Sequence, residues 1–428
     1  MTYAPPTTFA GPSPVWHPFT QHALAPEPPV VVRGRGAWLQ TAEGGRILDA
    51  ISSWWVITHG HCHPRIVAAI RDQAGELDQV IFAGHTHPAA EALGRRLVAM
   101  TPPGLDHVFF SDSGSTSVEV ALKMAAGFWR NGGTARSRIL ALEHGYHGDT
   151  IGTMSAGERG VYNAAYAPFL FDVTRLPFPE AGREDTTLAA LEAACRAAPA
   201  ALVLEPLVLG AGGMRMYAPW VLKEMAAICA RHGVLLIADE VMTGFGRTGT
   251  LFACAQAGVV PDILCLSKGL TGGALPLAAT LCRRDIFDAH YSTDRARTFF
   301  HSSSFTANPV ACAAALANLD IWAEEDVAGR VAALGALQEE RIAPFRDDAR
   351  FSGARRLGTI AALDLVVADA GYLAGIGPRL SAFFRERGLL VRPLGNTIYV
   401  MPPYCTSAGD LDLVYAAIAA AADLGTAA

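Results

Sequence analysis

The central part of the chain alternates amphipathic helices with short, continuous apolar runs. Residues 63–77 (HPRIVAAIRDQAGEL) carry apolar side chains at helical spacing, and residues 307–326 predict a longer helix. Between them lie six runs that predict strands: HVFFSDSG, RILALEH, AALVLEPL, GVLLIADEV, DILCLS and AATLCRR. Continuous rather than alternating apolar runs are typical of strands that helices cover on both faces. The pattern therefore predicts an open, mostly parallel α/β sheet.

The two ends of the chain follow a different pattern. The first 30 residues are rich in proline and predict an extended arm, and short strands are expected at residues 30–39 and 46–50. The C-terminal part predicts an α+β segment with a final helix. We therefore expect three parts: residues 1–63 as the arm and part of a small domain, 64–325 as the large α/β domain, and 326–428 as the rest of the small domain.

The composition narrows the class of protein. A chain of 428 residues with 51% hydrophobic and 17% charged residues is expected to be compact and to hold two domains. A net charge of −6 without a Lys/Arg run argues against a nucleic-acid surface. The N-terminus MTYAPPTTFAGPSP lacks the features of a signal peptide, and no uncharged apolar run is long enough to span a membrane. Eight scattered cysteines without a CxxC pair fit a reducing compartment, so a cytoplasmic location is expected.

Lysine is rare in this chain, and one lysine stands at an unusual place. It occurs only at Lys123, Lys223 and Lys268, whereas the other 31 of the 34 basic residues are arginine. Lys268 directly follows the apolar strand 263–266 and Ser267. Lysine, unlike arginine, can lose its proton and attack a carbonyl group. A surface lysine at a strand end remains the alternative at this point.

Other chemically informative residues stand at strand ends as well. Ligands of open α/β sheets bind at the carboxyl ends of the strands, and Gly114, Ser115, Glu205 and Asp239 are all predicted to lie there. The strand-to-helix turn at Gly114 and Ser115 presents backbone amides to a phosphate, although an ordinary serine N-cap would have the same sequence. Asp239 ends an apolar strand, and a buried carboxylate needs a partner, for example a protonated pyridine nitrogen.

Together these residues match one cofactor. A phosphate-binding turn, a buried aspartate and a lysine able to form a Schiff base are what pyridoxal 5′-phosphate (PLP) requires. Tyr146 in HGYHGDT adds an aromatic ring that can stack on the pyridine.

Two patterns compete with this interpretation. Residues 244–249 (GFGRTG) match the dinucleotide fingerprint, but no convincing helix follows and no acidic residue stands about 20 positions later. Residues 59–64 (HGHCHP) resemble a metal cluster, yet neighbouring side chains of an extended segment point apart. We therefore expect neither a dinucleotide nor a metal site.

With these motifs in place, the whole chain resembles the class III aminotransferases of PLP fold type I. The resemblance rests on motifs along almost the entire sequence: WHPFTQ, DAISSWW, HGHCHP, FFSDSGSTSVEVALKMA, EHGYHGDT, LEPL, LIADEVMTGFGRTG, LSKGLTGG, HSSSFTANP and RPLGNTIYVMPPY. It implies a large domain with a mostly parallel seven-stranded sheet, a smaller α+β domain, and PLP as the cofactor.

The resemblance also implies roles for the cofactor-binding residues. Lys268 would be the Schiff-base lysine and proton shuttle, Asp239 would pair with the pyridine nitrogen, and Tyr146 would lie against the cofactor ring. Gly114 and Ser115 would hold the phosphate.

The resemblance also implies two cofactor contacts that a neighbouring subunit would provide. Ser303 and Ser304 match a loop that, in this family, reaches the phosphate from the neighbouring subunit. The resemblance therefore implies a homodimer with shared active sites.

For the substrates, the resemblance implies that Trp54 and Trp55 wall the pocket and that Arg392 binds a distal carboxylate. The tryptophans could instead be core residues. Three positions depart from the family pattern: Phe19 stands where tyrosine is usual, Ser302 where glycine is common, and Ser304 where threonine is common. Ser304 keeps the hydroxyl group of threonine. Phe19 keeps the apolar wall without the hydroxyl group, and Ser302 adds bulk near the expected substrate.

The implied reaction transfers an amino group from S-adenosylmethionine to 8-amino-7-oxononanoate, a step of biotin synthesis. The substrate motifs SSWW, HGYHGDT and RPLGNTIYVMPP carry this expectation. The main alternative is an ω-amino acid or amine transaminase with another donor or a simple keto acid. An aminomutase or a decarboxylase on the same scaffold, or a non-catalytic PLP-binding protein, fits these motifs less well.

Overall fold

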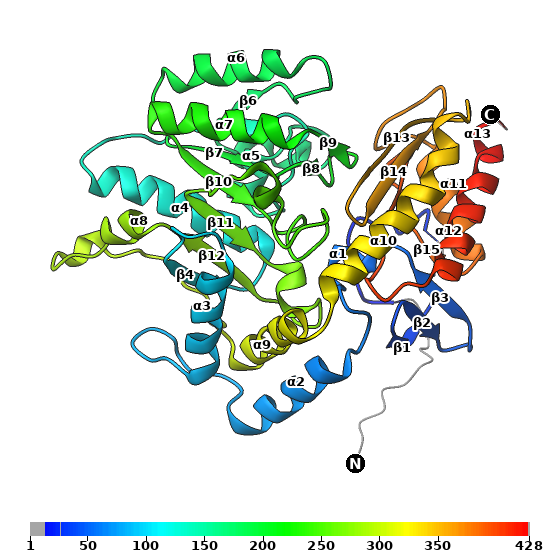
Figure 1. The fold of residues 1–428 in the computed structure, drawn as a ribbon, viewed down its shortest axis with the longest axis horizontal. Helices are drawn as coiled ribbons and strands as arrows, with labels where there is room; N and C mark the ends of the chain where they lie inside the picture. The colour runs from blue at the N-terminus through cyan, green and yellow to red at the C-terminus, as the bar shows by residue number, and fades with distance from the viewer. Residues whose placement is uncertain (1–12, 26, 427–428) are drawn as a thin grey trace.

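The computed structural model describes residues 13–25 and 27–426. A large domain is built on one seven-stranded sheet, and a smaller domain contains the N-terminal strands together with the C-terminal part of the chain (Figure 1). The first twelve residues of the predicted arm, and with them most of the N-terminal stretch MTYAPPTTFAGPSP, lie outside the described residues.

The large sheet has the order β4-β12-β11-β10-β7-β5-β6. Strand β12 runs antiparallel to both of its neighbours, and the other strands of this sheet run parallel to one another. The predicted mostly parallel sheet is thus confirmed. The strands are β4 (His107–Ser111), β5 (Ile139–Leu142), β6 (Thr174–Leu176), β7 (Ala201–Leu204), β10 (Leu235–Asp239), β11 (Ile263–Leu266) and β12 (Ala278–Cys282).

Helices cover both faces of this sheet, which explains the continuous apolar runs. In β5, Leu140 and Leu142 belong to the core on one face, and Ile139 and Ala141 belong to the core on the other. Helices α4, α5 and α8 contribute to the second core, and α3, α6 and α7 to the first. Their bounds are α3 (Pro88–Met100), α4 (Gly114–Asn131), α5 (Ile151–Ala156), α6 (Glu184–Cys195), α7 (Pro219–His232) and α8 (Arg284–Asp288).

The small domain joins both ends of the chain. One sheet has the order β1-β2-β3-β15, in which β3 and β15 are parallel neighbours, and a second sheet has the order β13-β14-β16. The strands are β1 (Val31–Arg35), β2 (Trp38–Thr41), β3 (Arg46–Asp49), β13 (Phe351–Leu357), β14 (Ile360–Leu365), β15 (Leu389–Leu390) and β16 (Thr397–Val400). The domain limits at residues 63 and 325 stay a prediction.

The remaining elements connect or cover these sheets. Helix α9 packs against α2 and α3 beside the large sheet, and α10 to α13 lie in the small domain (Figure 1). A short hairpin of β8 (Val208–Leu209) and β9 (Arg215–Met216) forms a separate two-stranded sheet. The helices are α1 (Ser52–Trp55), α2 (Pro64–Glu76), α9 (Pro309–Glu324), α10 (Val327–Ile342), α11 (Ile376–Glu386), α12 (Ala408–Ala421) and α13 (Asp423–Thr426).

The structure differs from the predicted strand at residues 30–39. The segment forms two antiparallel strands, β1 and β2, because the chain turns at Gly36, whose φ of 58° is the left-handed conformation that glycine adopts without strain. Within the described residues, no helix is both long and apolar enough to cross a membrane.

Candidate active site

The carboxyl ends of β10 and β11 bring the two central predicted residues together. Asp239 is the last residue of β10, and Lys268 follows β11 at the start of a 3₁₀ helix, Lys268–Thr271. The strands are parallel neighbours with Asp239 opposite Cys265, so both side chains reach the same edge of the sheet. There they line a pocket of about 200 Å³ together with Gly114, Ser115 and Tyr146.

Lys268 sits in surroundings that favour its neutral form. Its Nζ atom lies 4.7 Å from the centre of the Trp55 ring. Burial lowers the pKa of Lys268 from 10.5 to about 8, and the charge of Arg247 adds to this, whereas the carboxylates of Asp239 and Glu205 oppose it. The amine can therefore lose its proton near neutral pH, which arginine at this place could not do.

This pKa predicts the pH dependence of cofactor capture. Only a neutral amine attacks an aldehyde, so the rate at which the cofactor-free protein captures PLP covalently should rise with pH up to about 8 and then level off. Glu205→Gln should shift this midpoint to lower pH, because the carboxylate of Glu205 helps Lys268 to hold its proton. Stopped-flow absorbance over a pH series measures both effects. The exposed Glu224→Gln is a matched control, and a wild-type midpoint near 10.5 would contradict the prediction.

Asp239 has a protein partner that the sequence pattern does not reveal. His147 Nδ1 lies 2.7 Å from Asp239 Oδ2, and both side chains are buried. Burial alone would lower the pKa of His147, but the hydrogen bond to Asp239 and its charge outweigh burial, so the pKa of His147 is raised. His147 therefore orients the Asp239 carboxylate and favours its negative charge. Among the described residues, its Nε2 atom is buried without a hydrogen-bond partner.

Glu205 positions Tyr146 by its backbone. The Glu205 carboxylate accepts hydrogen bonds of 2.9 Å from the backbone N–H groups of Tyr146 and Gly210. Burial raises the pKa of Glu205 to about 7, and the charge of Asp239 adds to the increase. The carboxylate thus links the loop that carries Tyr146 to the segment after β7.

The turn at Gly114 and Ser115 has the form of an anion-binding site. Ser113 is the N-cap of α4 and forms a capping box with Thr116, so the following residues lie in the first turn of an 18-residue helix. A Cβ atom on Gly114 would lie only 2.5 Å from Val241 Cγ1, and one on Gly148 only 2.1 Å from Ser115 Oγ. Only glycine therefore fits at positions 114 and 148. Both glycines line the pocket that also contains the Lys268 side chain.

These groups fit PLP. The pocket combines an amine with a lowered pKa, a carboxylate held by a buried histidine, and a helix N-terminus between two tightly packed glycines. Each part of the cofactor (aldehyde, ring nitrogen and phosphate) has a chemical counterpart in the pocket.

The predicted substrate residues line a neighbouring pocket. Trp55 is buried and donates a hydrogen bond of 2.9 Å from Nε1 to the Tyr399 hydroxyl group, whereas Trp54 is 42% exposed. The Arg392 guanidinium carbon lies 4.8 Å from the centre of the Trp54 ring and 5.7 Å from that of Phe19. All of these residues border this second pocket, so the structure brings Phe19, both tryptophans and Arg392 together.

Ser302, Ser303 and Ser304 are not brought to this site in their own chain. They are absent from the described residues that line either pocket, and their polar atoms make local contacts, such as Ser303 Oγ with the Phe305 N–H group. Their expected contact with the active site of a neighbouring subunit stays a prediction.

The glycine-rich pattern at residues 244–249 has a structural role here. Its Arg247 is buried and donates hydrogen bonds to the backbone carbonyls of Pro402, Trp55 and Ile57. The guanidinium therefore joins the segment of the paired tryptophans to the C-terminal segment behind the site.

The histidine cluster also serves packing. His59 Nε2 lies 2.8 Å from Asn318 Oδ1, and His61 Nε2 lies 2.8 Å from Asp49 Oδ2. Among the described residues, no group of three or more His, Cys, Asp or Glu side chains is arranged to hold a metal ion.

His59 should make the protein sensitive to acid. Burial lowers its pKa from 6.5 to about 4, so between these values the unfolded chain binds the proton that the folded chain excludes. The free energy of unfolding should therefore fall as the pH drops below 6.5, by on the order of 3 kcal/mol at pH 4 from this residue. Urea unfolding at several pH values measures this loss. His59→Gln should flatten the dependence and the exposed His85→Gln should not; an unchanged slope in His59→Gln would contradict the assignment.

Comparisons with known proteins agree with this geometry. The model of the family described as Aminotransferase class-III matches residues 21–422. The chain belongs to the class III aminotransferases. Two relatives called adenosylmethionine-8-amino-7-oxononanoate aminotransferase come from Synechococcus elongatus (49% identical, covering 95% of this chain and 97% of the relative) and Mycobacterium leprae (40%, covering 96% and 95%).

Solved structures of the same family share the fold. The enzyme of that name from Methanocaldococcus jannaschii superposes with a TM-score of 0.91 at 31% identity, covering 96% of this chain and 97% of the other. An amine transaminase from an uncultivated Pseudomonas species, solved in its PLP-bound form, gives the same TM-score at 35% identity and covers 97% and 99%. The fold therefore establishes the family but does not separate these two activities.

Proposed function

We propose that this protein is a PLP-dependent aminotransferase that moves an amino group from S-adenosylmethionine to 8-amino-7-oxononanoate and so acts in biotin synthesis. The observation that carries the chemistry is Lys268, which is held with a lowered pKa in one pocket with Asp239 and the first turn of α4. The similarity along the whole chain to relatives with this name supports the substrates.

The chain's own residues would hold the cofactor as follows. The amides of Gly114 and Ser115 would bind the phosphate, Asp239 would hold a negative charge for the ring nitrogen, and Tyr146 would provide the face of its ring. When bound, PLP supplies an aldehyde carbon that takes up the amino group and a ring that accepts an electron pair.

Lys268 then performs the proton transfers. Its neutral amine would take the proton from the donor's α carbon and, in the second half-reaction, would deliver a proton to the acceptor carbon that gains the amino group. Trp55 packs against Lys268 and keeps water from one side of the amine. Burial lowers the pKa of Lys268 to about 8, which allows the same group to act as a base and then as an acid near neutral pH.

The substrate carboxylate has a matching partner. Arg392 lies over the rings of Trp54 and Phe19, and these cation–π contacts help to hold its guanidinium group in place. A fixed guanidinium can form two parallel hydrogen bonds to the far carboxylate of the acceptor. In this proposal Trp54 and Phe19 provide the apolar wall for the acceptor's hydrocarbon chain.

The proposal includes a homodimer in the cytoplasm. Ser303 and Ser304 would bind the phosphate in the partner's site, and Ser302 would lie near the partner's substrate. The exposed aromatic side chains of Phe300 (69%) and Phe305 (62%) beside this loop support an interface there, because large exposed apolar side chains in a cluster favour association. Sedimentation at low protein concentration tests the dimer.

A second candidate is an amine transaminase with another donor. The solved amine transaminase resembles this chain as closely in fold as the structure from Methanocaldococcus jannaschii does. The departures at Phe19 and Ser302 lie among the predicted substrate residues and are the positions that would favour this candidate.

Absorption spectroscopy of the PLP-loaded protein separates the two. S-adenosylmethionine alone should bleach the visible cofactor band, and 8-amino-7-oxononanoate should restore it. A band that ignores S-adenosylmethionine but bleaches with a simple ω-amine would exclude the proposed donor and support the amine transaminase.

A further inference from the structure

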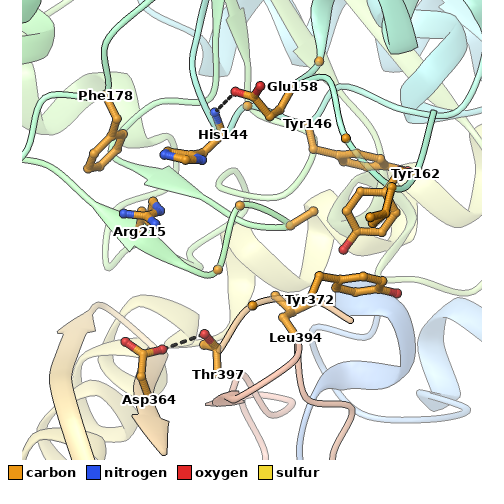
Figure 2. Close-up of a pocket in the computed structure, with 18 of the residues that line it drawn as sticks. His144, Tyr146, Glu158, Tyr162, Phe178, Arg215, Asp364, Tyr372, Leu394 and Thr397 are labelled. Carbon is orange, nitrogen blue, oxygen red and sulfur yellow. Dashed lines mark hydrogen bonds between the residues drawn. The ribbon is translucent and has the colours of Figure 1, made fainter. Parts of the chain in front are cut away.

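A third, larger cavity adjoins the active site and is not used by the chemistry described above. It has a volume of about 850 Å³ and lies between the β8–β9 hairpin of the large domain and strands β13 and β14 of the small domain. We call it the outer cavity and define it by His144, Phe178 and Arg215 on one wall and Asp364 and Thr397 on the other (Figure 2).

The outer cavity adjoins the active site. Tyr146, Gly148 and Asp149 line both the outer cavity and the Lys268 pocket. Tyr162 and Tyr372 line both the outer cavity and the pocket of Arg392, and their ring centres are 4.3 Å apart. The rest of a long molecule that reacts at Lys268 would therefore have this space beside it, beyond Tyr146.

Arg215 offers unused hydrogen-bond donors to the outer cavity. Its side chain is 40% exposed, and its ion pair with the half-exposed Glu180 is 3.6 Å long, which is a weak contact. Within the described part of the chain, its guanidinium group makes no hydrogen bond. The guanidinium carbon lies 5.8 Å from the centre of the Phe178 ring, so a planar ligand here would meet the donor fork together with the small exposed part (9%) of Phe178.

His144 adds a polar group that can donate and accept. Its backbone N–H group donates to Glu158 Oε2 at 2.7 Å, and its ring contacts Phe178 with centres 6.4 Å apart. Burial lowers the pKa of His144, and the charge of Arg215 lowers it further, so the imidazole is neutral at pH 7. A Cβ atom on Gly212 would lie 2.2 Å from the His144 carbonyl oxygen, so glycine is required for the hairpin to approach this wall.

The side chains that line the outer cavity match the functional groups of a purine base. A purine offers ring nitrogens as acceptors, an amino group as a donor and a flat face, which match Arg215, His144 and Phe178 respectively. The acceptor's far carboxylate is matched by Arg392, its ketone is the reacting group and its amino group stands on the next carbon, so no group of the acceptor would reach these residues. Asp149 lines both spaces, and its carboxylate can attract the sulfonium cation of the donor.

We propose that the outer cavity receives the adenosyl group of the amino donor, with Arg215 and His144 hydrogen-bonding the base beside Phe178. The inference rests on the proposed function, because it takes S-adenosylmethionine as the donor. Donor and acceptor then share Lys268 and diverge beyond Tyr146, the donor toward Arg215 and the acceptor toward Arg392.

The test compares Arg215→Met and His144→Leu with the wild-type PLP-loaded enzyme. The probe for binding is 5′-methylthioadenosine, which has the nucleoside but no amino group to transfer. Both variants should bind this probe about tenfold more weakly and lower kcat/KM for S-adenosylmethionine by about tenfold or more. The half-reaction with 8-amino-7-oxononanoate should stay within about twofold of wild type. Arg130→Met, at the exposed end of α4, is the matched control.

The outcomes separate this inference from the proposed function. If wild type reacts with S-adenosylmethionine but both variants keep the wild-type probe affinity and donor rate, the inference is wrong and the proposed function stands. Equal losses in both half-reactions would also overturn it, because they would reveal general damage to the site. If the wild-type enzyme does not react with S-adenosylmethionine, both the proposed function and this inference are wrong.

Discussion

Changing Lys268 to arginine is expected to lower turnover by about 10⁴-fold or more, the largest effect of any single substitution in this chain. The variant keeps a positive charge at the same edge of the sheet, but a guanidinium group does not lose its proton at neutral pH. It can neither capture the cofactor nor move the proton at the substrate carbon. Single-turnover kinetics with S-adenosylmethionine and the visible absorption of the cofactor measure the loss.

Lys223→Arg is the matched control, because Lys223 is exposed on α7 and is not among the described residues that line the pocket. The control should retain wild-type activity and absorption. Turnover of Lys268→Arg above about one per cent of wild type, in a preparation with the wild-type melting temperature, would refute the role of Lys268.

Asp239→Asn is expected to lower the rate of the donor half-reaction by about 10²–10³-fold. The amide keeps the shape of the side chain and can still accept from His147, but the negative charge opposite the cofactor's ring nitrogen is lost. The pKa of His147 should fall at the same time, because the charge of Asp239 is what keeps it raised against burial. NMR titration of His147 measures this second effect independently of activity.

The exposed Asp288→Asn at the end of α8 serves as control and should change neither quantity. A half-reaction within about fivefold of wild type, together with an unchanged His147 titration, would mean that Asp239 does not carry the charge assigned to it.

The local sequence pattern was sufficient to predict most strands of the large sheet. Runs such as Ile263–Leu266 must be apolar on both faces because helices cover both, and that requirement is visible in the sequence. The direction of β12 was not predictable, since an antiparallel strand buried on both faces has the same apolar pattern. Strands β6 and β13 were missed because TRL is very short and SGARRL is largely polar.

Some residues of the active site could also be predicted from the sequence, and others could not. Asp239 and Lys268 were predictable because each directly follows an apolar strand, and ligands collect at that edge of the sheet. His147 was missed although it stands beside Tyr146, since only the folded loop brings its Nδ1 atom to Asp239, 92 positions later. The carboxylate of Glu205 could be placed near the cofactor, but its two backbone partners could not be assigned. The outer cavity arises between two domains and therefore has no local sequence signal.

The parallel pairing of β3 with β15 has a consequence for the synthesis of this protein. Leu48 pairs with Leu389, so the first sheet of the small domain lacks an edge strand until nearly the whole chain has left the ribosome. At about 5–20 residues per second, β1 to β3 wait on the order of 20–70 seconds with an unpaired edge, while the large domain can already fold. Nascent chains should therefore be most vulnerable to aggregation and most dependent on chaperones in this interval. A truncation that ends before β15 is expected to retain a folded large domain and to lose its solubility through the N-terminal strands.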